Sequence, residues 1–232
     1  ISRIFPFKGH IMKAMILAAG RGERMMPLTK NTPKPLIKVR GLTLIEHSII
    51  ALKKAKITNI FVNVSYLGWQ IKAYLGNGSR LGVKVTYSDE FSGALDTAGG
   101  IINALPLLGR EPFVVINSDV LCDYDLSKLT LPADSLAHLI LVDNPKHNAK
   151  GDFSLIDNHQ IITANSKSLT FSGIGAYHPD FFKKHINTQD KLPLYPLFKE
   201  ALATSQLSGE HYQGYWQDVG TPERLELAKN AK

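Results

Sequence analysis

The chain contains very little cysteine and no long hydrophobic run. Cys122 is the only cysteine among 232 residues, so an intramolecular disulfide is impossible and a reducing compartment is compatible. No apolar segment reaches the roughly 18 residues that a membrane-spanning helix needs. We therefore expect no membrane partner and a cytoplasmic protein, in which Cys122 is a packing residue rather than a nucleophile.

Basic residues are in excess, but they do not form a nucleic-acid binding pattern. The formal net charge is +7, and Lys and Arg are spread along the chain instead of forming a tail. No basic run is interleaved with aromatic residues, so we expect no nucleic-acid partner. Part of the excess lies between residues 21 and 40, where Glu23 is the single acid among many cations. This local charge suits a site for anionic substrates.

One stretch near the N-terminus has the character of a phosphate-binding turn. A short apolar run at 14–18 breaks into glycine-rich backbone at Gly20 and Gly22, and Arg24 follows. Glycine lets a ligand lie against the main chain, and arginine offers a planar fork for phosphate oxygens. Lys34 lies between two prolines that restrict the backbone around it. A strand, a bare turn and then cations are typical of polyphosphate sites in α/β proteins.

Other interpretations of this stretch are weaker. It is not a P-loop, because no Gly-Lys-Ser/Thr closes it at the required spacing. As a dinucleotide fingerprint it is incomplete, since Met25 stands where the third glycine belongs. That gap argues against a dinucleotide-dependent oxidoreductase. A flexible loop with scattered solvated charges is the remaining plain alternative.

Alternating strand and helix patterns follow this turn. Helices are predicted at 44–55, 67–75, 97–105 (stopped by Pro106), 194–203 and 221–232, and strands at 59–64, 83–87, 113–117, 136–142, 153–156, 160–163 and 173–177. The alternation predicts a single-domain α/β fold with a doubly wound, mostly parallel sheet. Regularity fades after residue 143, where we expect a small β-rich lid over the ligand edge of the sheet, without a core of its own. We assign residues 12–232 to one domain and expect 1–11 to be a non-native or disordered extension.

Two aspartates are candidate metal ligands. Asp119 follows the buried strand at 113–117, so it lies at the carboxyl edge where open α/β sheets bind ligands. Asp218 lies on a second apolar strand, where a carboxylate needs a partner and a metal is a good one. The alternatives are a plain turn aspartate at 119 and a helix cap at 218. Thr221 already fills the capping position before Pro222.

The turn and the segments after it resemble the sugar-1-phosphate nucleotidylyltransferases. The resemblance rests on Gly20-x-Gly22-x-Arg24, Pro27-Leu28-Thr29 and Pro33-Lys34-Pro35-Leu36, and it extends over nearly the whole chain from Met12. Four further stretches resemble the family members that transfer uridylyl to N-acetylmuramate α-1-phosphate: 143–145, 151–153, 170–173 and 208–212. The resemblance implies a Rossmann-like, glycosyltransferase-A-like fold and an Mg²⁺-dependent reaction between a nucleoside triphosphate and a sugar-1-phosphate.

The resemblance also implies roles for individual residues. Arg24 is expected to hold the β- and γ-phosphates, and Lys34 the α-phosphate and the sugar phosphate. Asp119 and Asp218 match the family's metal ligands. Ala18, Ala19, Gly20, Arg21, Gly22, Glu90, Thr97 and Gly99 are expected to bind the nucleotide, and Asp152, Ser172 and Gly173 the sugar. Asp152 is equally well explained as a hairpin turn residue.

The base-contacting region departs from the common family pattern. Many relatives have glutamine where this chain has Glu90, and glycine where it has Asp96. An ionised glutamate only accepts hydrogen bonds, so it suits N3–H of uracil or thymine, or the N1–H and N2–H pair of guanine. It disfavours cytosine. The chemistry of Glu90 therefore narrows the choice of nucleotide base but does not determine it.

These observations predict one reaction and leave several alternative activities open. We expect UTP and N-acetylmuramate α-1-phosphate to react to UDP-N-acetylmuramate and pyrophosphate, as in cell-wall recycling, on a monomer or small homo-oligomer. Mannose-1-phosphate guanylyltransferase and glucose-1-phosphate thymidylyl- or uridylyltransferase activities remain rivals. A non-catalytic nucleotide-sugar sensor is the rival of another class, although such a protein is expected to lack part of the Arg24, Lys34, Asp119 and Asp218 set.

Overall fold

The computed structural model describes residues 4–5, 13–91, 93–156, 159–163, 168–188 and 190–231. The strands are β1 Ile4–Phe5, β2 Lys13–Leu17, β3 Lys38–Val39, β4 Leu42–Thr43, β5 Asn59–Val64, β6 Lys84–Asp89, β7 Phe113–Asn117, β8 Val120–Cys122, β9 Leu131–Pro132, β10 Ala137–Val142, β11 Phe153–Ile156, β12 Gln160–Thr163, β13 Ser168–Tyr177, β14 Leu207–Tyr212 and β15 Trp216–Asp218. The α-helices are α1 Leu44–Lys54, α2 Gly68–Leu75, α3 Asp96–Leu108, α4 Tyr195–Ala203 and α5 Pro222–Asn230. Short 3₁₀ helices are η1 Glu23–Met25, η2 Lys34–Leu36, η3 Ser79–Leu81, η4 Leu126–Lys128, η5 Lys146–Asn148 and η6 Pro179–His185.

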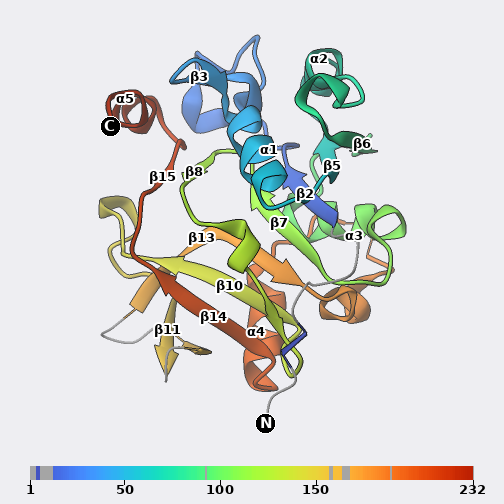
Figure 1. Cartoon of the computed structure of the whole chain (residues 1–232), viewed down its shortest axis with the longest axis vertical. Coiled ribbons are helices and arrows are strands. Elements are labelled where there is room, and N and C mark those ends of the chain that lie inside the picture. The colour runs from blue at the N-terminus through green and yellow to red at the C-terminus, as the bar shows by residue number, and fades with distance from the viewer. Residues whose placement is uncertain are drawn as a thin grey trace.

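The first half of the chain forms a doubly wound parallel layer. β7, β2, β5 and β6 lie side by side in that order and are all parallel (Figure 1). The chain runs from β2 outward to β5 and β6, and then returns through α3 to β7 on the other side of β2. The direction of winding therefore changes between β2 and β7. Loops that leave the carboxyl ends of two such strands diverge, and ligands bind in the crevice between them.

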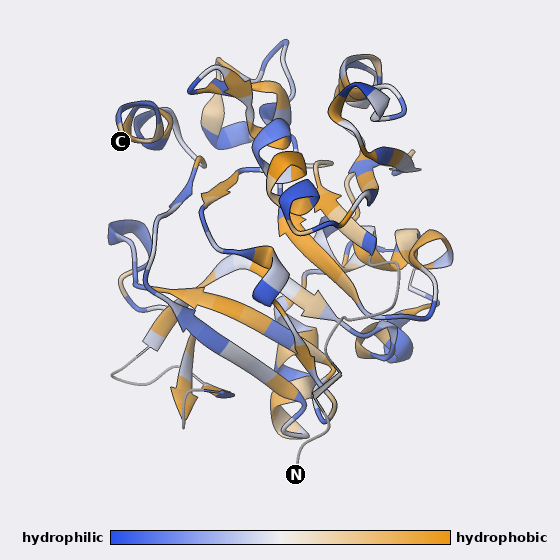
Figure 2. Ribbon diagram, viewed as in Figure 1, coloured by the Kyte–Doolittle hydropathy of each residue, from blue (hydrophilic) through white to orange (hydrophobic). Residues whose placement is uncertain are grey.

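Helices cover both faces of this sheet because the side chains of its strands alternate. In β2, Ala14 and Ile16 pack in a core with Ile45 and Ile49 of α1, whereas Met15 packs in a second core on the opposite face. The second core contains apolar residues of α3 and α4. Figure 2 shows β7 and β10 as hydrophobic along most of their length, as expected for strands buried on both faces.

The β-rich second half continues the same sheet. β13 pairs antiparallel with β7, from Ile174 opposite Ile116 to Tyr177 opposite Phe113. Beyond it the sheet is mixed, in the order β10, β14, β12, β11, β13, with β10 and β14 parallel and the other pairs antiparallel. The doubly wound α/β fold is confirmed, and the sugar half expected after residue 143 shares the second core with α3 and α4.

The C-terminal segment crosses back to the turn after β2. β15 pairs with β8, and α5 packs in a third core where Leu225 and Ala228 meet Met25 and Leu121. Thr221 caps α5 by accepting from the backbone N of Arg224, as predicted. The C-terminal segment therefore lies beside the candidate phosphate-binding turn, although the two are far apart in the sequence.

One sequence expectation differs from the structure, and another is not tested by it. α3 runs through Pro106 to Leu108 and ends at Gly109, whose backbone N bonds the carbonyl of Leu105. Pro106 lies in the last turn, so the one hydrogen bond that it cannot donate, to the carbonyl of Ile102, is lost near the end of the helix, which continues for only two more residues. Within the expected N-terminal extension, β1 pairs antiparallel with β9, and the other residues of 1–11 lie outside the described residues. Among the described helices none has the length and apolar character to cross a membrane.

Candidate functional site

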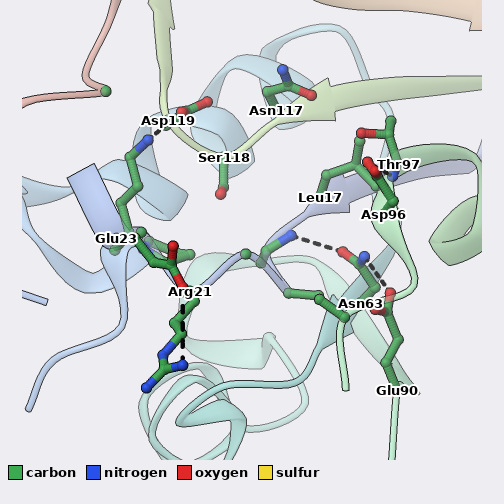
Figure 3. A pocket seen from close by; sticks show the side chains of 18 of the residues that line it. Leu17, Arg21, Glu23, Asn63, Glu90, Asp96, Thr97, Asn117, Ser118 and Asp119 are labelled. Carbon is green, nitrogen blue, oxygen red and sulfur yellow. Dashed lines mark hydrogen bonds and ion pairs between the residues drawn. The ribbon is translucent and has the colours of Figure 1, made fainter. Parts of the chain in front are cut away.

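A cavity of about 490 Å³ opens at the carboxyl ends of β2 and β7, where the winding direction changes. Figure 3 shows Asn117, Ser118 and Asp119 along one side of this cavity, and Asn63 with Glu90 across from them. The remaining lining residues are 17–24, Lys34, Pro35, Ala94, Asp96, Thr97 and Gly220. We call this space the nucleotide cavity, because it contains most of the residues predicted to bind nucleotide.

The glycine turn after β2 adopts a conformation that its residues explain. Gly22 has φ of +67°, a left-handed conformation that favours glycine, and a Cβ built on it would lie 3.0 Å from Cγ2 of Thr29. Thr29 is fully buried and donates from Oγ1 to the carbonyl of Gly22 at 2.8 Å. A Cβ on Gly20 would meet nothing within 4 Å. The turn is therefore packed on one side at Gly22 and open at Gly20.

The two predicted phosphate-binding cations lie at this turn but differ in exposure and in ion pairing. Arg24 is exposed in η1, lines the nucleotide cavity, and has no hydrogen bond or ion pair with another described residue. The side chain of Lys34 is largely buried, with 13% of it exposed, and its Nζ forms an ion pair with Oδ2 of Asp119. Arg24 thus offers an unused fork, whereas Lys34 already neutralises a carboxylate.

Asp119 and Asp218, which are 99 positions apart in the sequence numbering, meet in the fold. Asp218 of β15 lies opposite Val120 of β8, and the backbone N of Val219 donates to the carbonyl of Asp119 at 2.8 Å. Both aspartates line a second cavity of about 330 Å³. This second space shares Arg24, Asn117 and Asp119 with the nucleotide cavity. We call it the sugar cavity, because it contains Ser172 and Gly173.

The surroundings of Asp218 leave one of its oxygens available. Oδ2 forms an ion pair with Nη1 of Arg224 at 3.0 Å. Oδ1 is buried and forms no hydrogen bond to the part of the chain that the structure describes, and Nε2 of His147 lies 3.4 Å from it. An unpartnered buried carboxylate oxygen is costly, by about 1–3 kcal/mol, so it fits a site completed by a ligand.

Those oxygens fit a hard divalent cation. Carboxylate oxygens are the ligands that Mg²⁺ prefers, and it is usually bound through one or two carboxylates together with substrate phosphates. Asp119 and Asp218 supply two. The described residues contain no cluster of three or more His, Cys, Asp or Glu side chains able to hold a metal by themselves. The donor set therefore suits a metal that arrives with, or shares, an anionic substrate.

Glu90 is engaged inside the protein. Its Oε1 accepts from Nδ2 of Asn63 at 2.7 Å, its Oε2 accepts from the backbone N of Leu95 at 2.8 Å, and Oδ1 of Asn63 accepts from the backbone N of Ala18 at 2.7 Å. Gly100 makes room for this pair, because a Cβ there would lie 2.6 Å from Oε1. Burial raises the pKa of Glu90, against the opposing effect of its hydrogen bonds. Direct contact of Glu90 with a base stays a prediction.

Seven of the eight predicted nucleotide residues line the nucleotide cavity: Ala18, Ala19, Gly20, Arg21, Gly22, Glu90 and Thr97. Gly99 does not. It is buried in α3, where its backbone N donates to the carbonyl of Leu192, and a Cβ would lie 3.0 Å from that of Leu95. The absence of a side chain at Gly99 allows close packing here, and its contact with nucleotide stays a prediction.

Of the three predicted sugar residues, Ser172 and Gly173 line the sugar cavity. Asp152 does not line either cavity. Its Oδ2 accepts from the backbone N of Phe171 at 2.8 Å and its Oδ1 from Nδ2 of Asn148 at 3.1 Å. Both oxygens of Asp152 are thus engaged by groups of the protein, which favours the turn role, and the sugar role of Asp152 stays a prediction.

Several residues at the site were not singled out from the sequence. Asn117 ends β7 and Asn63 is the last residue but one of β5, so a polar residue at a strand's carboxyl end was an available signal. His147 and Arg224 line the sugar cavity. Arg224 gave no local signal, because a cation in the first turn of a helix is usually solvated. His211 lies outside both cavities, with its Nε2 at 2.9 Å from Oδ1 of Asp143.

The chain is similar to several known proteins along most of its length. The chain is 48% identical over 225 residues to an N-acetylmuramate alpha-1-phosphate uridylyltransferase of Neisseria meningitidis, covering 94% of this chain and 97% of that protein. It is 30% identical to a protein of the same name in Caulobacter vibrioides, covering 94% and 96%. A mannose-1-phosphate guanylyltransferase catalytic subunit beta of Dictyostelium discoideum is 31% identical, with 91% of this chain and 62% of that protein covered.

The fold has a counterpart among solved structures. A structure described as a glucose-1-phosphate thymidylyltransferase of Bacillus anthracis superposes with a TM-score of 0.80 at 23% identity, and covers 95% of this chain and 96% of that one. At that identity the likeness concerns the fold alone. The sequence profile of the family described as nucleotidyl transferase matches residues 13–232. The chain therefore belongs to the nucleotidyl transferase family.

Proposed function

We propose that this chain transfers a uridylyl group from UTP to N-acetylmuramate α-1-phosphate. A phosphate oxygen of the sugar-1-phosphate forms a bond to the α-phosphorus of UTP, the bond from that phosphorus to the bridging oxygen of the β-phosphate breaks, and pyrophosphate leaves. The products are UDP-N-acetylmuramate and pyrophosphate. The choice of substrates is supported by the 48% identical relative, which matches along nearly the full length of both chains.

The observation that carries the reaction class is the meeting of Asp119 and Asp218 beside two cations. Both carboxylates line the sugar cavity, Asp119 also lines the nucleotide cavity, and Arg24 lines both. The nucleotide and the sugar phosphate would therefore meet at Asp119. Two anionic reactants repel each other, so a catalyst of this reaction must neutralise charge and hold an in-line geometry. The site has the parts for both tasks.

Asp119 and Asp218 would hold Mg²⁺, which when bound supplies positive charge against the triphosphate. The chain's own cations act at separate places. Arg24 has an unused planar fork and would hold the β- and γ-phosphates that become the leaving pyrophosphate. Lys34 would exchange its carboxylate partner for oxygens of the α-phosphate and the sugar phosphate. Its burial holds the ammonium in place for that exchange.

The reaction needs no general base. The attacking phosphate oxygen is already ionised at neutral pH, so no proton must be removed before the new bond forms. This agrees with the absence of a catalytic histidine pairing in the sugar and nucleotide cavities as described, where His147 faces only a carboxylate. The demands on the protein are positioning and charge stabilisation, which are the main terms in phosphoryl transfer.

The proposal is tested by pyrophosphate release from a substrate panel. UTP, GTP, dTTP, CTP and ATP are each combined with N-acetylmuramate, N-acetylglucosamine, glucose and mannose 1-phosphates, with and without Mg²⁺. We expect rapid release with UTP and N-acetylmuramate 1-phosphate, and none with EDTA. Preference for GTP with mannose 1-phosphate would replace the proposed substrates within the same reaction class. Silence across the panel would instead favour a nucleotide-sugar sensor.

Two further points belong to the proposal. A cytoplasmic location is proposed because the nucleoside triphosphate substrate is made there. The oligomeric state stays at a monomer or small homo-oligomer, and sedimentation velocity at several protein concentrations distinguishes these. Neither point alters the chemistry, because every residue used above comes from one chain.

A further inference from the structure

Arg224 is a buried cation with donors that the described chain does not use. It lies in the first turn of α5, is 8% exposed, and its Nη1 forms an ion pair with Oδ2 of Asp218 at 3.0 Å. Its Nε and Nη2 are buried and have no hydrogen-bond partner among the described residues. A guanidinium stays charged under all conditions in which a protein is folded. Unused donors on a buried charge therefore call for a partner from outside the chain.

The neighbours of Arg224 hold its guanidinium in place. Thr221 accepts from the backbone N of Arg224, which anchors the start of α5. Gly220 leaves the space that the guanidinium occupies, because a Cβ built there would lie 1.9 Å from Nη2. The long side chain is thus confined against the strand end that carries Asp218. A ligand that binds a confined side chain has little ordering cost to overcome.

Arg224 lines the sugar cavity of about 330 Å³, a volume within the range of small-molecule sites, roughly 300–1,000 Å³. Other walls of this cavity offer neutral hydrogen-bonding groups suited to sugar hydroxyls, on Asn148, Thr170 and Ser172. This combination of a confined cation and neutral polar groups fits a sugar that carries an acidic group.

The charges in the sugar cavity favour an anion. Asp119 is neutralised by Lys34, and Asp218 faces both Arg224 and His147. Arg24 adds a further cation at the boundary with the nucleotide cavity. Each carboxylate in the cavity therefore already has a cationic neighbour, and the donors that remain are positive.

We propose that the Nε and Nη2 edge of Arg224 binds an oxyanion of the sugar substrate, while Nη1 keeps Asp218 in position. This rests on the proposed function, because it takes the 330 Å³ cavity as the place of the sugar phosphate. The edge of a guanidinium matches two oxygens of a carboxylate or a phosphate. N-acetylmuramate 1-phosphate carries both groups: the 1-phosphate and the carboxylate of its lactyl ether.

The test compares Arg224→Lys, which keeps the charge and loses the fork, with Arg110→Lys, the same change at an exposed arginine. The KM of each sugar-1-phosphate is measured at saturating UTP and Mg²⁺. We expect Arg224→Lys to raise the KM for N-acetylmuramate 1-phosphate about 10-fold or more, as for loss of a bidentate contact, and Arg110→Lys to leave it unchanged. The KM for UTP should change by less than about 3-fold in both.

N-acetylglucosamine 1-phosphate, which lacks the lactyl carboxylate, identifies the bound group. If Arg224→Lys raises the KM of both sugars equally, the guanidinium binds the phosphate. If only the KM for N-acetylmuramate 1-phosphate rises, it binds the carboxylate. Gly220→Ala is a second variant that keeps Arg224 but displaces its guanidinium, and it should give the same pattern.

Mn²⁺ titration without substrates distinguishes two explanations of a raised KM: loss of a direct contact between Arg224 and the sugar substrate, or an indirect effect on metal binding through Asp218. The proposal expects Arg224→Lys to keep the Mn²⁺ affinity within about 3-fold of wild type, since the introduced ammonium would still neutralise Oδ2 of Asp218. A fall in Mn²⁺ affinity that parallels the rise in KM, or an unchanged KM for both sugars in an active enzyme, overturns the oxyanion role alone. Wild-type silence with every sugar-1-phosphate overturns the proposed function and, with it, this inference.

Discussion

Asn63 donates from Nδ2 to Oε1 of Glu90 at 2.7 Å, and its Oδ1 accepts from the backbone N of Ala18 at the same distance. Glu90 also binds the backbone N of Leu95. One carboxylate thereby joins the turn after β2 to the segment before α3, which form two walls of the nucleotide cavity. Because ionised Glu90 only accepts, it sets the orientation of the Asn63 amide.

Glu90→Gln should weaken UTP binding. A glutamine amide has one acceptor and one donor, so either Asn63 or the backbone N of Leu95 loses its acceptor. We expect the KM for UTP to rise about 10-fold, the effect of about 1.4 kcal/mol, with a small change in kcat. Glu226→Gln, at an exposed position of α5, is the matched control. An unchanged KM for UTP would mean that the Glu90–Asn63 contact does not shape the cavity.

Acidification should reproduce part of this effect in the wild type. Burial raises the pKa of Glu90, so its carboxylate gains a proton at a higher pH than an exposed carboxyl does. Protonation removes an acceptor, and the KM for UTP should rise as pH falls through that raised pKa. The Glu90→Gln variant should lack this pH dependence. Equal pH profiles for both proteins would contradict the assignment.

Asp119→Asn and Asp218→Asn should each lower turnover by at least about 100-fold, the typical cost of losing one preorganised charge at the reacting phosphate. Circular dichroism and thermal melting should show that both variants stay folded, because an amide nearly matches a carboxylate in volume. Asp134→Asn, at an exposed turn, is the control and should keep full activity. Near-normal rates in either variant would refute its assignment as a metal ligand.

Gly173→Ala should destabilise the protein where the two cavities join. Gly173 has φ of +81°, and a Cβ on it would lie 2.6 Å from Nδ2 of Asn117. Gly41→Ala isolates the backbone strain, since Gly41 has φ of +84° and nothing within 4 Å of its Cβ position. We expect about 1 kcal/mol for Gly41→Ala and about 2–3 kcal/mol for Gly173→Ala by urea unfolding. Equal losses of unfolding free energy in the two variants would show that the Asn117 side chain moves aside at little cost.

His138 should make the fold sensitive to acid. Burial lowers the pKa of this β10 histidine to about 4, with a smaller contribution from His159. Its ordinary pKa of about 6.5 applies in the unfolded chain, so its contribution to stability is complete above that pH and falls as pH drops toward 4. The loss amounts to about 3 kcal/mol. His138→Asn should remove this fall in the free energy of unfolding between pH 6.5 and 4. The matched variant His159→Asn, at an exposed position, should largely keep it. A wild-type free energy of unfolding that does not change over this range would refute the effect.

The parts of the site that come from one continuous segment could be predicted. Gly20, Gly22 and Arg24 carry their conformational and charge signals within a few residues, and Asp119 follows a strand whose pattern is plain. The strands at 59–64, 113–117, 153–156 and 160–163 agree residue for residue with the prediction. In these cases local chemistry and tertiary position agree.

The parts that depend on distant neighbours could not be predicted. Gly99 carries the same local signal as a ligand-facing glycine, yet its space is taken by the segment around Leu192. Asp152 could serve a sugar or a turn, and only the position of Phe171 favours the turn. Arg224 gains its meaning from Asp218 and Gly220, which bring it to the cavity. The roles of these residues depend on how distant segments pack against them, and a single sequence does not show that packing.

The pairing of β13 with β7 has a consequence for how catalysis is organised. Four consecutive residue pairs join the two strands, from Ile174 with Ile116 to Tyr177 with Phe113. Strands beside the nucleotide cavity and strands beside the sugar cavity thus belong to one continuous sheet. Closure of two rigid lobes at this place would have to break that pairing, so we expect side chains and surface loops, rather than lobes, to adjust when the substrates bind.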